Sequence, residues 1–340
     1  MSYNHNLIAG RTCSIPAVLL IALLFSFSAC KTDDSPIQPP ATITEQINTG
    51  SKFTLLKAAL KQAGLDVTLG ATGAYTLFAP TDDAFRAFGL TSDLVIAAAS
   101  PDLVKSVMQY HVLGTKVESS AIPTATNTAQ QTLFPLGSVY LTKPVAVTTA
   151  TGSTTTVAVN GARVLDNGTQ ASNGIIYPID RILLPPAYGN IPNTLASIPT
   201  IYALLAPSAG ISFKLLQQAV TKAGIGGPLT ATGPLTVFAP TDNAFRASGY
   251  DSAAIARAPA ATLATVLGYH VVNSRTYTPT LTNAASLTTL QGGTITVGVS
   301  TTAVTVTGKG NGTTASNIIG PDVTATNGVI QIIDRLLLPQ

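Results

Sequence analysis

The pattern of apolar and polar positions predicts a helix at the start of the first long globular stretch. Apolar residues recur there at steps of 3, 4 and 3, with lysines between them, at Phe53, Leu56, Leu60 and Ala63. This spacing places the apolar side chains on one helical face, and Gly64 supplies the C-terminal stop. Residues 213–224 repeat the pattern, so a second amphipathic helix is predicted there.

A strand and two further helices are predicted next. The strand covers residues 75–78, and either Thr81 or Asp82 caps the helix that follows. Asp82 lies one turn before Arg86, so we expect these two side chains to form an ion pair. Another helix begins at residues 100–102, where a serine cap precedes a proline. One face of this helix is expected to carry Leu103, Val107 and Tyr110.

The remaining pattern of each half is typical of strands. Runs rich in β-branched residues, partly alternating, occupy residues 145–147, 154–159, 293–299 and 303–307. Two later runs, 174–184 and 328–338, are almost continuously apolar, and we expect them in the middle of the core. Each half therefore begins with helices and ends in a sheet.

The two halves are copies of one another. Residues 78–82 recur unchanged at 238–242, an offset of 160, and residues 110–112 recur at 269–271, an offset of 159. The third match, Asn173-Gly174 with Asn327-Gly328, has an offset of 154. Ordered matches at a slowly shrinking offset indicate a duplicated domain. We place the first domain at 41–186, a linker at 187–192 and the second domain at 193–340.

The N-terminal segment predicts a lipid anchor. An apolar stretch behind Arg11 is too short to span a bilayer and is typical of a signal peptide, here residues 1–29. It ends in small residues before Cys30, similar to the bacterial lipobox, so Cys30 is the expected lipidation site and residues 30–40 a tether. A plain cleaved signal with an incidental cysteine is the alternative. Residues 31–34 resemble a signal for export to the outer cell surface.

Composition removes several classes of function. Hydrophobic residues make up 46% of 340 residues, enough for real cores, whereas charged residues make up 10% and the formal net charge is +3. This charge is too small to attract nucleic acid, so no nucleic-acid partner is expected. The two cysteines, Cys13 and Cys30, precede the globular part, which excludes disulfides and cysteine metal sites there.

Histidines are the first candidates for chemistry, because imidazole is the commonest general base and metal ligand. His111 and His270 have no second ligand or catalytic partner close by in the sequence. We therefore favour a structural role, in which each histidine ends a helix and hydrogen-bonds the neighbouring chain. The alternative is partner binding by the paired residues Tyr110, His111, Tyr269 and His270.

The acidic residues of the repeated motifs also favour structural roles. Asp82 and Asp242 are expected to cap helices, where the helix dipole stabilises a carboxylate, rather than to bind a cation. Asp180 and Asp334 follow apolar runs, so each is expected to pair with an arginine or with backbone amides. The arginine next to each is expected on the opposite face. No catalytic residue, cofactor or metal is assigned.

These repeated motifs resemble the fasciclin (FAS1) domain family twice over. The resemblance covers roughly residues 41–340 and rests on a strand ending in Thr-Leu-Phe-Ala-Pro-Thr, a central Tyr-His pair and an Asn-Gly-Val-Ile run ending in Asp. Its structural motif residues are Thr81, Asp82, Asn173, Gly174, Asp180, Thr241, Asp242, Asn327, Gly328 and Asp334. Tyr177 and Gln331 replace the family's histidine, and Pro178 removes a ladder donor, so that strand is expected to be bulged or locally at an edge.

The resemblance implies an α+β fold, with each domain a wedge-shaped β-sandwich whose helices pack along one edge. It also implies cell adhesion or extracellular-matrix binding through protein or polysaccharide contacts. Together with the anchor, this predicts a non-enzymatic adhesion lipoprotein of the outer membrane, exposed at the cell surface. A periplasm-facing lipoprotein that binds envelope polysaccharide is the alternative, and a hydrolytic enzyme is the less favoured class.

Overall fold

The computed structural model describes most of the chain after the predicted signal and tether. The described residues are 40–124, 127–135, 137–143, 147–149, 152–154, 157–186, 189–205, 210–300 and 303–340. The predicted signal peptide, Cys30 and the tether up to residue 39 lie outside them. Residues 39–340 form one compact unit. Among the residues that the structure describes, no helix is both long enough and apolar enough to cross a bilayer.

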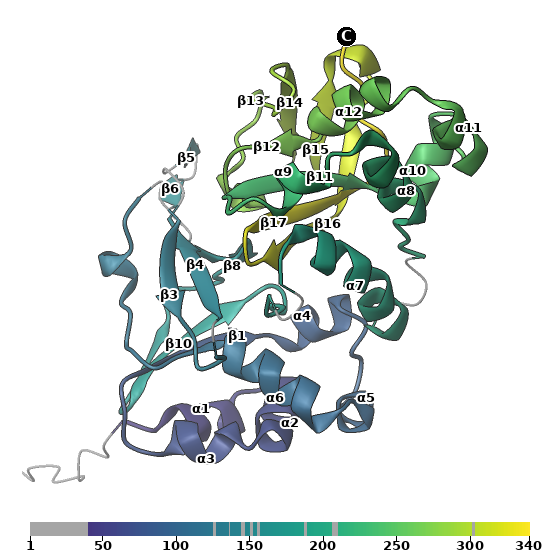
Figure 1. Ribbon diagram of the computed structural model, residues 1–340. Helices are drawn as coiled ribbons and strands as arrows, with labels where there is room; N and C mark the ends of the chain where they lie inside the picture. Colours follow the sequence, from purple (N-terminus) through teal and green to yellow (C-terminus); the bar gives the residue numbers. More distant parts are fainter. Residues whose placement is uncertain are drawn as a thin grey trace, which may run out of the picture. The chain divides into compact units, whose positions relative to one another are not determined.

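The described part of the first repeat contains six α-helices, which Figure 1 labels. They are α1 (Ile43–Thr49), α2 (Thr54–Ala63), α3 (Leu65–Gly70), α4 (Asp82–Ala87), α5 (Asp93–Ala98) and α6 (Pro101–Tyr110). The predicted helix over the first apolar face is α2, and it ends at Gly64, whose φ of 66° is in the left-handed region. Helix α6 begins with Pro101 at its first position, as predicted.

One expectation for α6 is wrong. Its buried residues are Val104, Met108 and Tyr110, whereas Leu103 is 40% exposed. Tyr110 is buried as expected and Val107 packs half-buried against the core beneath the helices, so the error concerns Leu103 alone. Helix α6 packs against α2 through Val104 and Met108 instead.

The strands of the first repeat form two sheets and a small ribbon. The first sheet has the order β2-β1-β10-β9, with β1 (Tyr75–Pro80), β2 (Val112–Leu113), β9 (Thr169–Ala171) and β10 (Gly174–Ile179). The second has the order β3-β4-β7-β8, with β3 (Thr128–Gln131), β4 (Ser138–Thr142), β7 (Ala158–Val159) and β8 (Ala162–Arg163). The ribbon pairs β5 (Val147–Thr149) with β6 (Gly152–Thr154). Strands β1 and β10 pair in parallel.

The second repeat follows the same order. Its helices are α7 (Ile191–Leu205), α8 (Lys214–Ala223), α9 (Gly226–Thr230), α10 (Asp242–Ala247), α11 (Ser252–Arg257) and α12 (Ala260–Gly268). Its strands are β11 (Leu235–Pro240), β12 (Val271–Val272), β13 (Ser286–Thr288), β14 (Thr294–Val299), β15 (Val304–Gly308), β16 (Ser316–Ala325) and β17 (Gly328–Ile333). Helix α7 begins inside the segment predicted as a linker, and Ile191 is buried in the second core.

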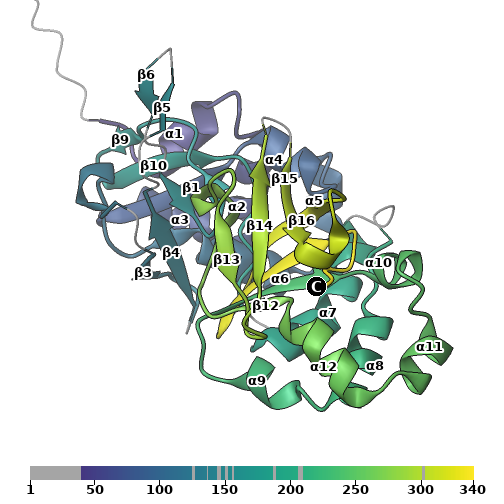
Figure 2. The same cartoon turned by 90° about the horizontal axis from the view of Figure 1, so that it is seen from above.

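In the second repeat all the strands join one sheet, in the order β12-β11-β17-β16-β15-β14-β13. Figure 2 shows β14, β15 and β16 running side by side. The long strand β16 connects the two parts of this sheet, because it pairs with β15 at its start and with β17 along its remaining length.

The central strands of each repeat are buried on both faces. In β1, Leu77 and Ala79 belong to the core beneath the helices, whereas Phe78 belongs to the core between the two sheets. Figure 1 shows α1, α2, α3 and α6 on one side of β1 and β10, and β3 and β4 on the other. The continuous apolar runs are thus confirmed as central strands. They end at Ile179 and Ile333, five residues before the predicted ends.

Pro178 lies in a regular stretch of β10. It pairs with Ala79 of β1 without a break in register, and β9 covers β10 only over Gly174–Ile176. Pro178 lies beyond the β9 partner, but residues 163–165 cover this side of β10: Leu165 N donates to Pro178 O at 2.8 Å, and Val164 forms a bridge with Ile179. The expected bulge or local edge is therefore wrong, and Pro178 is buried within a regular strand. In the second repeat the bulges fall instead in β16, on either side of Gly320.

Candidate functional site

The two motif histidines are buried, and each hydrogen-bonds two backbone groups. His111 follows α6 and is fully buried; its Nδ1 donates to Val107 O at 2.7 Å and its Nε2 accepts from Leu183 N at 2.9 Å. His270 makes the same pair of bonds, to Val266 O at 2.8 Å and from Leu337 N at 2.9 Å. Each histidine therefore connects a helix to the chain that follows the last strand, which is the structural role favoured from the sequence.

Burial also sets the protonation of these rings. It lowers the pKa of His111 and of His270 to about 4, because the charged form loses its hydration. Nε2 accepts a backbone N–H in both cases, so the proton of the neutral ring is on Nδ1. At neutral pH each ring is uncharged and both of its nitrogens are engaged.

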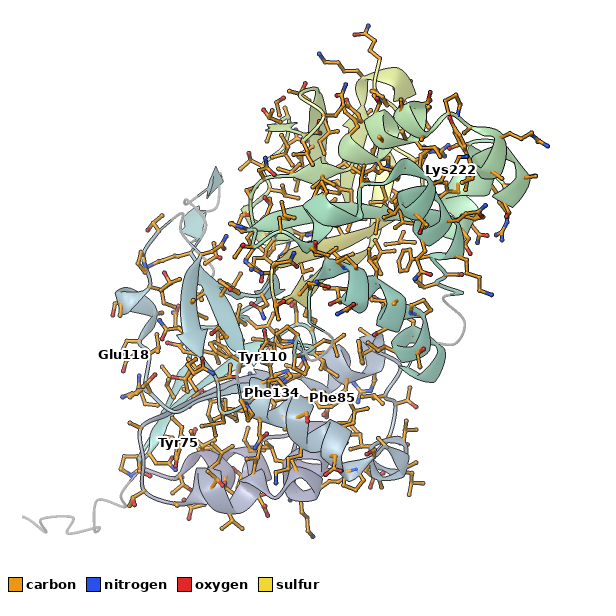
Figure 3. The ribbon with its side chains drawn as sticks, viewed as in Figure 1. Tyr75, Phe85, Tyr110, Glu118, Phe134 and Lys222 are labelled. Carbon is orange, nitrogen blue, oxygen red and sulfur yellow. The ribbon has the colours of Figure 1, made fainter. Side chains whose placement is uncertain are left out.

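The tyrosines beside them are equally internal. Tyr110 donates its hydroxyl to Ser138 O at 2.8 Å and accepts from Asn160 Nδ2 at 2.8 Å. Its ring meets Phe134 edge-on at 6.2 Å, and Figure 3 labels this pair in the first repeat. Tyr269 donates to Thr294 O and accepts from Lys309 N. Burial raises the pKa of Tyr110 above its usual range.

The four side chains that were candidates for partner binding, Tyr110, His111, Tyr269 and His270, are at most 2% exposed. A partner on the surface cannot contact side chains that are enclosed in this way. We therefore assign them to the core.

The motif residues Thr81 and Asp82 cap two different helices. Thr81 accepts Ala84 N at 3.3 Å and caps α4, which decides between the two predicted caps. Asp82 accepts Leu55 N at 2.8 Å and so caps the neighbouring helix α2. The predicted ion pair between Asp82 and Arg86 is wrong, because Arg86 pairs with Asp83 at 2.7 Å.

The second repeat reproduces this double cap. Thr241 accepts Ala244 N at 3.3 Å, and Asp242 accepts Leu215 N at 2.8 Å. Asp242 also accepts the Ser212 hydroxyl at 2.6 Å. Asp82 and Asp242 come shortly after the first strand of each domain, and each carboxylate accepts a backbone amide of a long helix, α2 in the first domain and α8 in the second. The motif therefore connects that strand to that helix in both domains.

Asn173 fixes the entry to the last strand. Its Oδ1 accepts Ile43 N at 2.9 Å, while its Nδ2 donates to Leu69 O and Ala71 O, both at 2.7 Å. The next residue must be glycine, because a Cβ on Gly174 would lie 2.1 Å from Tyr75 O.

The corresponding pair in the second repeat behaves identically. Asn327 accepts Ile191 N at 2.9 Å and donates to Leu229 O at 2.9 Å and Ala231 O at 2.8 Å. A Cβ on Gly328 would lie 2.2 Å from Leu235 O. The Asn-Gly motif is therefore a requirement of the fold in both domains.

The carboxylates after the last strands accept backbone amides, one of the two partners predicted. Asp180 accepts Arg163 N at 2.8 Å, and Asp334 accepts Asn317 N at 2.7 Å. The expectation that the adjacent arginine faces away is wrong for the first repeat. Arg181 Nε lies 3.5 Å from Asp180 Oδ1, because β10 has already ended at Ile179 and strand alternation no longer applies.

A polar junction joins the two repeats at Asp322, which the sequence analysis missed. Asp322 has a φ of 64° in the bulged part of β16, and its side chain is 1% exposed. Its Oδ1 accepts Thr278 N and Gln331 Nε2, both at 2.8 Å. Its Oδ2 accepts the Thr278 hydroxyl and Arg181 Nη1, the latter at 3.0 Å from the first repeat. Burial raises the pKa of Asp322, and Arg181 opposes that shift.

The turn that receives Asp322 has no room for a side chain. Gly161 has a φ of 81°, and a Cβ there would lie 2.2 Å from the Asp322 carboxyl carbon. The neighbouring Asn160 accepts the Tyr277 hydroxyl of the second repeat at 3.2 Å, and its amide donates to Tyr110. The junction therefore connects directly to the core of the first repeat.

An arginine and an aromatic ring extend this junction. The Arg275 guanidinium of the second repeat lies 4.0 Å from the centre of the Tyr140 ring of the first. Asn127 Nδ2 donates to Arg275 O at 2.8 Å. In a chain with few charges, an aspartate within an apolar run such as Asp322 could have indicated a buried ion pair. Its partner Arg181 lies 141 positions away, so the sequence does not identify the pair.

Within the described ranges, no group of three or more His, Cys, Asp and Glu side chains is placed to hold a metal ion. The titratable motif residues that sequence reasoning singled out are spread over both repeats, and each is bonded to backbone groups of its own repeat. What the arrangement does chemically is hold strands, helices and the two repeats together.

Comparison with known proteins agrees with this architecture. The family model described as "Fasciclin domain" matches residues 51–185 and 212–339. The chain is 27% identical over 278 residues to transforming growth factor-beta-induced protein ig-h3 of Sus scrofa, covering 78% of this chain and 35% of that protein. It is 30% identical over 181 residues to protein sll1483 of Synechocystis sp., covering 53% of this chain and 93% of that protein. The chain thus spans about a third of the length of the first relative.

A solved structure is also similar. It is that of a FAS1 domain pair from the insect cell adhesion molecule Fasciclin I, with a TM-score of 0.38 and 17% identity, covering 84% of this chain and 95% of that one. The family model covers more than half of the present sequence, once in each repeat. The chain belongs to the fasciclin domain family.

Proposed function

We propose that this protein is a non-enzymatic adhesion module, tethered to the outer membrane through a lipid on Cys30 and exposed at the cell surface. The observation that carries the proposal is the match of the fasciclin model to both repeats. The resemblance implies binding of an extracellular protein or polysaccharide, and Cys30 follows a segment similar to a lipobox.

The positions of the reactive side chains support a binding role. His111 and His270 are neutral, buried and bonded at both ring nitrogens. Asp82 and Asp242 accept backbone amides. General acid–base chemistry needs a group that can reach a substrate with a suitable pKa, and these buried groups lie away from the surface.

The junction at Asp322 supports the use of both domains together. Arg181 and Asp322 join the repeats through a contact in which the carboxylate is fully enclosed. Two binding faces on one chain can contact the same surface at once, which raises avidity without any new contact.

The test is protease treatment of intact cells that express the full chain, with a Cys30→Ala variant alongside. We expect the wild-type chain to be digested on unbroken cells and to increase cell attachment to a protein-coated or polysaccharide-coated surface. The Cys30→Ala variant should be released from the membrane and should lose the attachment. Protection of the wild type until the outer membrane is opened would contradict surface adhesion and favour the periplasm-facing polysaccharide-binding alternative.

A further inference from the structure

We propose that an apolar pocket between α2, α5 and α6 on one side and α7 on the other binds a small, uncharged molecule rich in hydrocarbon. The pocket has a volume of about 210 Å³. Adhesion through surface contacts does not require such a site, so this proposal goes beyond the proposed function.

The lining determines the chemical class of the ligand. Phe85, Phe88 and Met108 of the first domain form one wall, and Ile201 of α7 and Val323 of β16 lie on the other. Among the described residues that line it, no side chain is ionisable, and the polar ones are one serine and three threonines. A ligand that carried a carboxylate or an ammonium group into this lining would lose hydration without gaining a partner. An uncharged apolar ligand loses nothing of this kind and gains by leaving water.

The volume limits the size of the ligand. An apolar cavity of roughly 150 Å³ accepts a single benzene ring, and pockets for drug-sized ligands start at about 300 Å³. A volume of about 210 Å³ therefore fits a short hydrocarbon chain or a small aromatic molecule. Because the walls come from both domains, the pocket encloses its ligand on two sides and suits a small molecule better than a docked helix.

The duplication provides an internal comparison for the mouth of the pocket. Leu103 lines the pocket and is also 40% exposed, so it lies at the mouth. On the neighbouring helix α5, Leu94 is 76% exposed and Val95 is 41% exposed, immediately before Ile96, which lines the pocket. Leu103 therefore extends the apolar lining to the surface, and Leu94 and Val95 add exposed apolar area on the helix that carries Ile96.

The second repeat has small or polar residues at the same places. With the offset of 159 found for the Tyr-His motif, the equivalents of Leu94, Val95 and Leu103 are Ala253, Ala254 and Thr262. The register is supported by Ile96 and Ile255, which are both buried. The second repeat adopts the same fold without exposed apolar residues at these three positions, so the fold does not require them. Their presence in the first repeat indicates a contact that only the first repeat makes.

The test measures binding of a neutral apolar dye, N-phenyl-1-naphthylamine, by its fluorescence increase. The protein is the chain with Cys30→Ala, purified without detergent so that micelles do not compete for the dye. We expect saturable binding that 1-octanol displaces and octanoate at neutral pH displaces at least about tenfold less well, because the pocket lining offers the carboxylate no partner.

Two variants address the site and one serves as a matched control. Leu103→Thr copies the second repeat and should weaken dye binding about fivefold to tenfold, since apolar contact is lost at the mouth. Ala99→Leu adds volume inside the lining and should weaken it at least as much. Val67→Thr removes an apolar side chain that is 77% exposed on α3 and does not line the pocket, so it should bind the dye like the unmodified chain.

Several results would overturn the proposal. Unchanged dye binding in Leu103→Thr and Ala99→Leu, with circular dichroism showing that both fold, would place the dye elsewhere. An equal loss in Val67→Thr would indicate general adsorption. Sedimentation showing a dimer that Leu103→Thr dissociates would make this face an interface between copies of the chain.

Discussion

Acidification should destabilise both domains through their buried histidines. The pKa of His111 and that of His270 fall from 6.5 to about 4 on folding, so between these values the unfolded chain binds more protons than the folded one. The stability that each neutral ring contributes is complete above pH 6.5 and is lost as the pH falls towards 4. Protonation of Nε2 would also break its bond from Leu183 or Leu337.

The size of the effect follows from the same pKa values. A shift from 6.5 to about 4 corresponds to roughly 3 kcal/mol per histidine once both states are protonated. Between pH 7 and pH 5 the same linkage gives a loss of about 2 kcal/mol per domain. The buried Asp322 has a raised pKa and therefore an effect of opposite sign, in which its cost at neutral pH is relieved by acid.

The assay is urea unfolding at pH 7 and pH 5, followed by circular dichroism and by tyrosine fluorescence, since the chain has no tryptophan. His111→Gln should lower stability at both pH values but should remove about 2 kcal/mol of the difference between them. His270→Gln should do the same for the second domain. Comparing each variant with the parent cancels the contribution of Asp322 and the other carboxylates. If His111→Gln loses as much stability between pH 7 and pH 5 as the parent does, the proposed depression of the histidine pKa is refuted.

Three further predictions concern the motifs and the junction. Asn173→Ala removes one acceptor and two donors from buried backbone partners and should cost roughly 3 kcal/mol in urea unfolding, with an equal cost for Asn327→Ala; a loss below about 1 kcal/mol would contradict this. Gly174→Ala places a Cβ 2.1 Å from a carbonyl oxygen of β1, so the first domain should not fold. Circular dichroism should then show a loss of secondary structure, and a native spectrum would refute the clash. A double-mutant cycle of Asp322→Asn and Arg181→Met should give a coupling of about 2 kcal/mol across the junction, and additivity would show that the ion pair contributes nothing.

Local features of the fold could be predicted from the sequence because they depend on neighbouring residues. The steps of apolar residues in α2 and the left-handed Gly64 that ends it are both local properties, and both predictions are confirmed. The central position of β10 and β17 was visible because a strand buried on both faces has no polar alternation. The duplicated α+β fold is likewise confirmed by the family match in each repeat.

The side chains that face a neighbour were harder to assign. Leu103 and Val104 are both apolar, and only the packing of α6 on α2 decides that Val104 is buried and Leu103 exposed. The same limit applies to Asp82, whose role as a cap was predicted but whose helix was not. Its partner, Leu55, lies 27 positions earlier in the chain.

The junction could not be predicted because its contacts are remote in sequence. Arg181 and Asp322 are separated by 141 positions, and Asn160 and Tyr277 by 117. A short sequence motif cannot indicate a contact between residues so far apart in the chain. Asp322 also depends on a bulge in β16 and on the absence of a side chain at Gly161, which are properties of two different domains.

The parallel pairing of the first and last long strands has a consequence for how the protein is made. Tyr75 pairs with Gly174, and Leu235 pairs with Gly328, so in each domain the central ladder joins residues more than 90 positions apart. Such high contact order slows folding, because the entropy of closing a long loop is lost before the strands gain their contacts. A domain of this kind completes its core only after its final strand has been synthesised. Each domain of this chain therefore stays unfolded until nearly all of its sequence has been made, which is the state that the export proposed above requires.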